Sequence, residues 1–125
     1  MVSRTQNAGL ARVTSLLAAA SWWLGWGTGT NAAASATNVT TTSTTEARVS
    51  ATPTQQTTTV TNDTLRLTAT ITAAGTRAIT EVGAFDAAGT GSPPTGGNMA
   101  YYADFSVINL VSGDSISFTL NVTYS

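Results

Sequence analysis

Residues 64–73 read TLRLTATITA, and the strict alternation in this stretch indicates the fold class. Successive side chains of a β-strand point to opposite faces, so a period of two gathers one kind of residue on one side. The apolar set is Leu65, Leu67, Ala69, Ile71 and Ala73. Threonines and one arginine form the other set. The pattern therefore predicts a strand with one face in a core and the other in water.

The end of the chain repeats this pattern in residues 115–125, SISFTLNVTYS. Its apolar set is Ile116, Phe118, Leu120, Val122 and Tyr124. Ser112, Gly113 and Asp114 supply a turn before it. Upstream of the first strand, residues 55–64 read QQTTTVTNDT, and Asn62 with Asp63 can form the turn of a hairpin. We expect these segments to be antiparallel strands.

Two more strands are expected between these, in residues 77–85 (RAITEVGAF) and 99–110 (MAYYADFSVINL). The inward set of the second is Met99, Tyr101, Ala103, Phe105 and Val107. Ile79 and Val82 break the period of the first, which predicts a bulge near Glu81. The glycine- and proline-rich residues 87–98 are expected to form a surface loop. About five strands with turns between them favour a mainly β fold, either an antiparallel sandwich of jelly-roll type or a small barrel.

The N-terminal part has a different character. Leu10, Val13 and Leu17 recur at helical spacing, which predicts a short helix from residue 8 to about residue 21, capped by Asn7. Residues 34–45, ASATNVTTTSTT, have no apolar period and are expected to form an extended arm. We therefore divide the chain into residues 1–46, with helix, tryptophan-rich turn and arm, and an antiparallel β domain in residues 47–125.

Residues 21–30, SWWLGWGTGT, contain all three tryptophans. Aromatic residues dominate interface hot spots, so we interpret this cluster as an anchor that packs on the sheet or on a neighbouring subunit. The anchor residues are Trp22, Trp23, Leu24 and Trp26. Gly25, Gly27 and Gly29 are assigned to a turn, because a phosphate-binding loop would need a preceding strand and a following helix. Stacking of the tryptophans on a sugar or a base stays open.

The composition excludes several functions. Only 9% of residues are charged, against about 25% in average soluble proteins, and the net charge is −1. So little repulsion between copies indicates an oligomer or a larger assembly. Histidine, lysine and cysteine are absent, which removes the side chains most used for acid–base catalysis near neutral pH, zinc binding and Schiff-base chemistry. We expect no enzyme, no cofactor and no metal, and the scattered arginines predict no nucleic-acid partner.

The carboxylates admit structural and chemical interpretations. Asp63 and Asp114 lie in turn sequences, where aspartate commonly accepts backbone N–H groups. Glu81 and Asp86 could form a glycosidase-like pair or bind Ca²⁺. Pairing of Glu81 with Arg77 or Arg66 is the more ordinary expectation.

Residues 13–26 are fairly apolar and follow Arg4, as in a secretory signal. Arg12 and the tryptophans do not fit a signal, and the stretch is shorter than the roughly 20 residues of a membrane helix. We expect neither a signal nor a membrane partner.

Three blocks of the chain resemble a known group of proteins. They are LGWGTGT at residues 24–30, GTRAITEVGAFDA at 75–87 and INLVSGDSISFTLNVTYS at 108–125. In order and spacing these are similar to small virion proteins of tailed bacteriophages, including cyanobacterial phages. The resemblance implies a non-enzymatic structural protein, either a capsid decoration or cement protein or a tail-fibre protein.

From the resemblance and the low charge we expect a homotrimer on the outer capsid surface, with the major capsid protein as partner. A position in the tail fibre, collar or baseplate is the alternative. A secreted carbohydrate-binding module is a further alternative.

Overall fold

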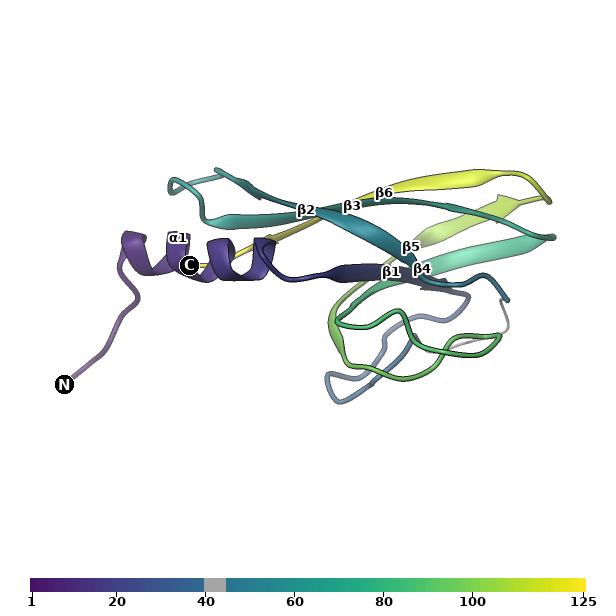
Figure 1. Cartoon of the computed structure of the whole chain (residues 1–125), viewed down its shortest axis with the longest axis horizontal. Helices are drawn as coiled ribbons and strands as arrows, with labels where there is room; N and C mark the ends of the chain where they lie inside the picture. The colour runs from purple at the N-terminus through teal and green to yellow at the C-terminus, as the bar shows by residue number, and fades with distance from the viewer. Residues whose placement is uncertain (40–44) are drawn as a thin grey trace.

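The computed structural model describes residues 1–39 and 45–125 of the chain. Within them it contains one helix and six strands (Figure 1). These are α1 (Asn7–Ala18), β1 (Trp22–Gly27), β2 (Val49–Gln56), β3 (Thr64–Thr72), β4 (Arg77–Phe85), β5 (Met99–Leu110) and β6 (Ser115–Thr123). The strands lie in the order β5-β4-β1-β2-β3-β6, each antiparallel to its neighbours. The predicted mainly β class is confirmed, as one nearly closed, barrel-like sheet with a short N-terminal helix.

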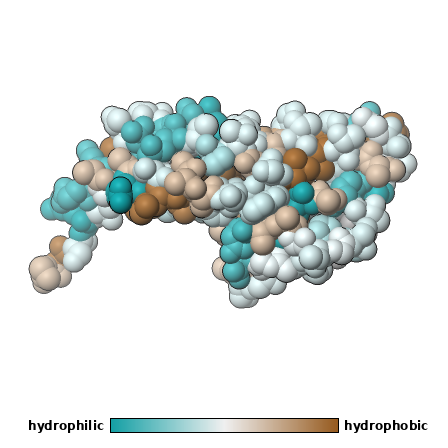
Figure 2. All heavy atoms as spheres, in the orientation of Figure 1, coloured by the Kyte–Doolittle hydropathy of each residue, from teal (hydrophilic) through white to brown (hydrophobic). Residues whose placement is uncertain are grey.

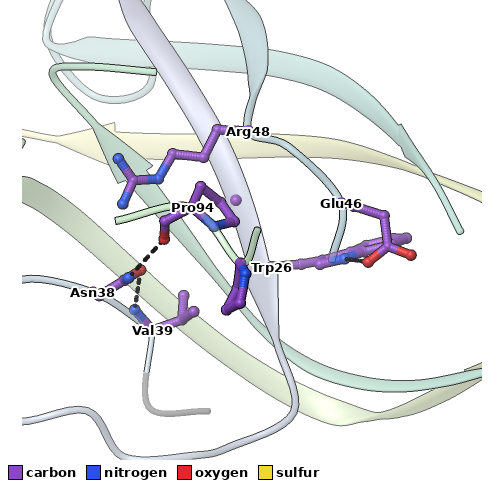
Figure 3. Close-up of a pocket in the computed structure, with 8 residues that line it drawn as sticks. Trp26, Asn38, Val39, Glu46, Arg48 and Pro94 are labelled. Carbon is purple, nitrogen blue, oxygen red and sulfur yellow. Dashed lines mark hydrogen bonds between the residues drawn. The ribbon is translucent and has the colours of Figure 1, made fainter. Parts of the chain in front are cut away.

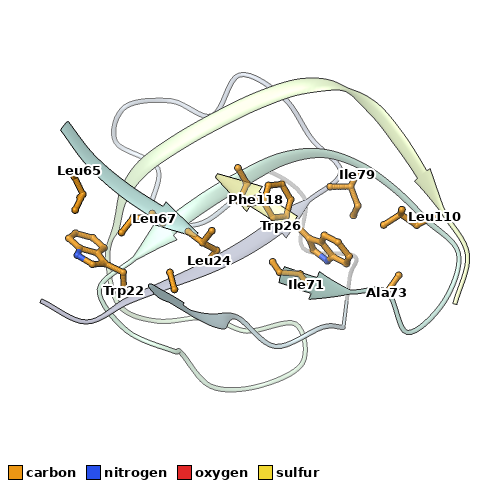
Figure 4. Close-up of a cluster of buried hydrophobic side chains, with 13 residues drawn as sticks. Trp22, Leu24, Trp26, Leu65, Leu67, Ile71, Ala73, Ile79, Leu110 and Phe118 are labelled. Carbon is orange, nitrogen blue, oxygen red and sulfur yellow. The ribbon is translucent and has the colours of Figure 1, made fainter. Parts of the chain in front are cut away.

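The two strands with the clearest alternation pair with each other. β3 and β6 are in register along their whole length, from Thr64 opposite Thr123 to Thr72 opposite Ser115. The predicted hairpin is confirmed in part: β2 pairs with β3, but β2 spans Val49–Gln56, so most of the strand predicted in residues 55–64 is the connecting loop. This register places both apolar sets on the inside of the barrel, where Leu65 and Leu67 are fully buried and Phe118 is nearly so (Figure 4).

The tryptophan-rich segment is a strand, which the sequence analysis did not predict. β1 lies between β4 and β2 and so occupies the middle of the sheet. The predicted turn at Gly25 and Gly27 is therefore wrong, since both glycines lie within β1, while Gly29 lies beyond its end. A side chain at Gly25 would begin 3.0 Å from Cγ of Arg48, which explains the glycine. Residues 1–46 thus contribute a central strand to the β domain.

The helix α1 is shorter than predicted and begins differently. It spans Asn7–Ala18, its N-cap residue is Gln6, and that residue makes no capping hydrogen bond through its side chain. The predicted cap at Asn7 is wrong, because Asn7 already belongs to the helix. Ala19 ends it at the approach to β1, where the chain must become extended.

The helix is fixed to the β2–β3 hairpin by Thr14, which is fully buried. Its hydroxyl lies 2.6 Å from the carbonyl oxygen of Asn62 and 2.8 Å from Nε2 of Gln55. At the other end, the indole N–H of Trp22 donates to the carbonyl of Leu17 at 2.8 Å. Polar contacts therefore hold α1 against the barrel.

The predicted bulge in β4 is confirmed by a register shift between Ile79 and Glu81. One residue of β4, Thr80, lies opposite three of β5 there, since Ile79 pairs with Ile108 and Glu81 with Asp104. The extra residues of β5 change which side chains point inward. The predicted inward position of Val107 is wrong for this reason, and Val107 is 53% exposed.

The segment between β1 and the predicted arm follows the sheet. Gly29 donates its N–H to Oε1 of Glu81 at 3.2 Å, and its carbonyl accepts from the hydroxyl of Thr80 at 2.5 Å. The N–H of Asn31 donates to Oδ2 of Asp104 at 2.9 Å. Side chains of β4 and β5 therefore hold the chain as it leaves β1. Residues 40–44 of the predicted arm lie outside the described residues.

Candidate functional site

The barrel is open between β5 and β6, the two edges of the sheet. A groove of about 230 Å³ lies there, and we call it the open seam. Its apolar lining comes mainly from Ala103, Phe105 and Ile108 of β5 and from Ile116, Phe118 and Leu120 of β6. None of the residues that line the groove is charged. The open seam is therefore a strip of partly exposed core.

Side chains bridge the open seam where the backbones do not pair. The rings of Phe105 and Phe118 have centroids 6.0 Å apart, and the hydroxyls of Tyr101 and Tyr124 are 2.6 Å apart. Burial raises the pKa of Tyr101, and the hydrogen bond to Tyr124 adds to this shift, so the phenol stays neutral near pH 7. In the described part of the chain, β5 pairs only with β4, and β6 pairs only with β3.

The edge strand β6 lacks the features that usually prevent strand addition, whereas β5 has register shifts against β4. Natural edge strands carry lysines, prolines or bulges that block pairing with another chain. β6 has no charged residue, no proline and no register shift against β3. β5 carries a single charge, Asp104, whose carboxylate already accepts the N–H of Asn31. The edges are therefore suited to being covered by another polypeptide.

Apolar exposure continues beyond the groove toward the β5–β6 turn. Val107, Ile108 and Val111 are 53%, 39% and 61% exposed. On the face drawn in Figure 2, brown apolar patches lie among mostly white residues of intermediate hydropathy. Such a surface has little charge to keep it apart from other proteins.

The structure places most of the predicted anchor inside its own subunit. Trp22, Leu24 and Trp26 are only 5%, 0% and 4% exposed and belong to the core (Figure 4), while Trp23 is half-buried. They pack as predicted, but the interface role is wrong for these three, because side chains buried in their own barrel have no surface left to contact a partner. Residues of the open seam, in contrast, are predicted core residues by their alternation along β5 and β6. Local sequence cannot distinguish a residue of the closed core from a residue of the open seam. The difference becomes visible only when the strand order is known.

Glu81 and Asp86 are both held by local hydrogen bonds. Glu81 is fully buried, and it accepts a hydrogen bond from the hydroxyl of Tyr102 at 2.6 Å. Burial of the Tyr102 phenol, together with this hydrogen bond, raises the pKa of Tyr102 to about 12. Asp86 is exposed, and the N–H of Asn98 donates to it at 2.7 Å, which lowers the pKa of Asp86. In residues 1–39 and 45–125 no group of three or more acidic, histidine or cysteine side chains is placed to hold a metal ion.

The arginines expected near Glu81 are engaged elsewhere. Nε of Arg77 lies 3.0 Å from Oε1 of Glu46, and Nε of Arg66 donates to Oδ1 of Asn121 at 2.9 Å. The ion pair thus joins Arg77 to a carboxylate just ahead of β2. Burial alone would raise the pKa of Glu46, but the N–H of Ala74 and the guanidinium of Arg77 outweigh it and lower the pKa.

Comparisons of the chain with protein-family models, with curated proteins and with solved structures gave no match. Within the described residues, no helix combines the length and the apolar character needed to cross a bilayer.

Proposed function

We propose that this protein is a non-enzymatic structural protein of a bacteriophage virion. It is a decoration or cement protein that binds the outer surface of the major capsid shell, as a homotrimer. The open seam is the observation that carries the proposal, because it offers an uncharged apolar groove between the two edge strands of the sheet. The location on a virion is supported by the three sequence blocks that resemble small virion proteins.

Two kinds of interaction would contribute to binding at the open seam. Covering apolar surface contributes roughly 25 cal/mol per Å² removed from water. A strand added to the edge of β5 or β6 would also form backbone hydrogen bonds, as in other cases of β-augmentation. Each contact can be weak, since a symmetric oligomer on a symmetric shell repeats it many times. The nearly neutral chain allows many copies to pack closely without mutual repulsion.

A tail-fibre, collar or baseplate protein would use the same open seam in fewer copies, and it remains the second candidate. The secreted carbohydrate-binding module is disfavoured by the positions of the tryptophans. Sugar platforms present aromatic faces to solvent, whereas Trp22 and Trp26 are buried.

The proposal is tested by adding the purified protein to capsids that lack it. We expect saturable binding, and we expect Ile108→Lys to reduce affinity about tenfold or more, because it places a charge in the groove. Thr52→Lys is the matched control, since Thr52 is exposed on β2, away from the open seam. Circular dichroism and thermal melting verify that both variants fold. Equal binding of both variants would contradict the role of the open seam, and no binding of the unaltered protein would contradict the capsid location.

A further inference from the structure

Arg48 is a buried charge just ahead of β2, and it is only 6% exposed. Its stem passes Gly25, and its guanidinium carbon lies 3.5 Å from the centroid of the Phe85 ring. Nη1 donates to the carbonyls of Ala87 at 3.0 Å and Gly96 at 2.8 Å. The β4–β5 loop therefore wraps around one end of this side chain.

The opposite edge of the guanidinium consists of Nε and Nη2. Both atoms are buried, and neither has a hydrogen-bond partner among the residues that the structure describes. These two donors lie side by side along one edge of the planar group, which is the geometry that matches the two oxygens of a carboxylate. Leaving such donors buried and unpaired costs free energy, so an occupant for this edge is expected.

The chain supplies no carboxylate for Arg48. Glu46 accepts from Arg77 and from the N–H of Ala74, and Asp86 accepts from Asn98. Within residues 1–39 and 45–125 Arg48 takes part in no ion pair, and the sequence of residues 40–44 is TTTST, without a carboxylate. Burial lowers the pKa of Arg48, only partly opposed by Asp86, but a guanidinium stays protonated in proteins. Asp86 thus acts on Arg48 through its charge, but no carboxylate of the described residues bonds to Nε or Nη2.

Arg48 lines a narrow pocket with Trp26, Asn38, Val39 and Pro94 (Figure 3). Its volume is about 10 Å³, which is close to the space that one water molecule needs. Nδ2 of Asn38 donates to the carbonyl of Pro94 at 3.1 Å, and this bond joins the segment after β1 to the β4–β5 loop across the pocket. We call this hydrogen bond the cover. A pocket of this volume holds nothing larger than water, so a larger ligand requires its walls to move apart.

We propose that Arg48 is a binding site for a carboxylate group, which enters when the cover between Asn38 and Pro94 opens and pairs with Nε and Nη2. Two features favour a carboxylate over phosphate. Glu46 also lines the pocket and repels a dianionic phosphate more strongly than a monoanionic carboxylate. The remaining walls include apolar side chains that suit a flat monoanion. The carboxylate is that of a free organic acid or of an aspartate or glutamate side chain on a neighbouring protein.

The test uses the ¹⁵N-labelled full chain and follows the Nε–H signals of its five arginines by NMR. Sodium acetate is added at pH 7 while chloride keeps the ionic strength constant. We expect a saturable downfield shift of the Arg48 signal and none for Arg66, which donates to Asn121 at the surface. N-acetyl-aspartate amide, titrated in parallel, represents the side chain of a partner. Binding of acetate alone would assign the site to free acids, and binding of both would assign it to protein carboxylates as well.

The Asn38→Ala variant tests the cover. Losing one hydrogen bond that holds the pocket closed should tighten acetate binding about 2- to 10-fold, because more molecules are open at any time. Asn109→Ala, at an exposed position of β5, is the matched control and should leave the affinity unchanged. An Arg48 signal that does not respond, or that drifts linearly together with all other arginines, would overturn the proposal and leave only a buried water at this edge. Unchanged affinity in Asn38→Ala would overturn the cover.

Discussion

Asp63 shows how a single side chain shapes this protein. It is almost fully buried, and its carboxylate accepts the N–H groups of Thr58, Thr59 and Val60 at 2.9–3.0 Å and the hydroxyl of Thr64 at 2.9 Å. These hydrogen bonds hold the pKa of Asp63 well below its usual range, and the one from the N–H of Val60 has the largest effect. The structural role predicted for a turn aspartate is confirmed here. It is also confirmed at Asp114, which accepts the N–H of Val111.

The ionisation of Asp63 makes the stability of the fold depend on pH. Its pKa is lowered in the folded state, so its contribution is fully present above the unfolded pKa of about 4 and declines as the pH falls below that value. We expect Asp63→Asn to be less stable than the unaltered protein at pH 7, with a smaller difference at pH 3. Urea unfolding at the two pH values measures this difference. An equal difference at both values would show that the charge of Asp63 is not what stabilises the turn.

At the scale of elements, β1 organises the barrel. It is the only strand that joins the β4–β5 side of the sheet to the β2–β3–β6 side in the described residues. Leu24 is completely buried at its centre, and Trp22 and Trp26 fill the core on either side (Figure 4). The barrel therefore depends on a segment that the sequence analysis placed outside the β domain.

Truncation at β1 measures that dependence. Leu24→Ala should lower the free energy of unfolding by about 2–5 kcal/mol, since it removes buried contacts and leaves a cavity. Val107→Ala removes an aliphatic side chain that is 53% exposed, and it should change stability by less than about 1 kcal/mol. Chemical denaturation of both variants compares them, and a similar loss in the two would contradict a central role for β1.

The elements that could be predicted are the strands with one solvent-exposed face and one buried face. β3 and β6 alternate cleanly, because threonine or serine and large apolar residues separate to opposite sides. β1 has the inward set Trp22, Leu24 and Trp26, but glycines at positions 25 and 27 resemble a turn when only local sequence is considered. The order of strands depends on contacts between distant residues, so neither the open seam nor the pocket at Arg48 could be predicted from periodicity.

At the scale of the whole molecule, the low charge and the incomplete barrel both favour a surface that is covered by another protein. A chain with net charge −1 keeps two strand edges with a single charge between them, an apolar groove and exposed aliphatic side chains near the β5–β6 turn at its surface. A neighbouring protein that covers these features removes apolar area from water and pairs free backbone groups. In our proposal, that neighbour is the major capsid protein.

The most direct test of the virion role is the number of copies of this protein per purified particle, measured by quantitative mass spectrometry against the major capsid protein. Our account predicts a ratio close to one to one, as expected for a protein that covers the shell. About a dozen copies or fewer per particle would contradict the capsid position and favour the tail or collar. Absence of the protein from purified particles would contradict the virion role altogether.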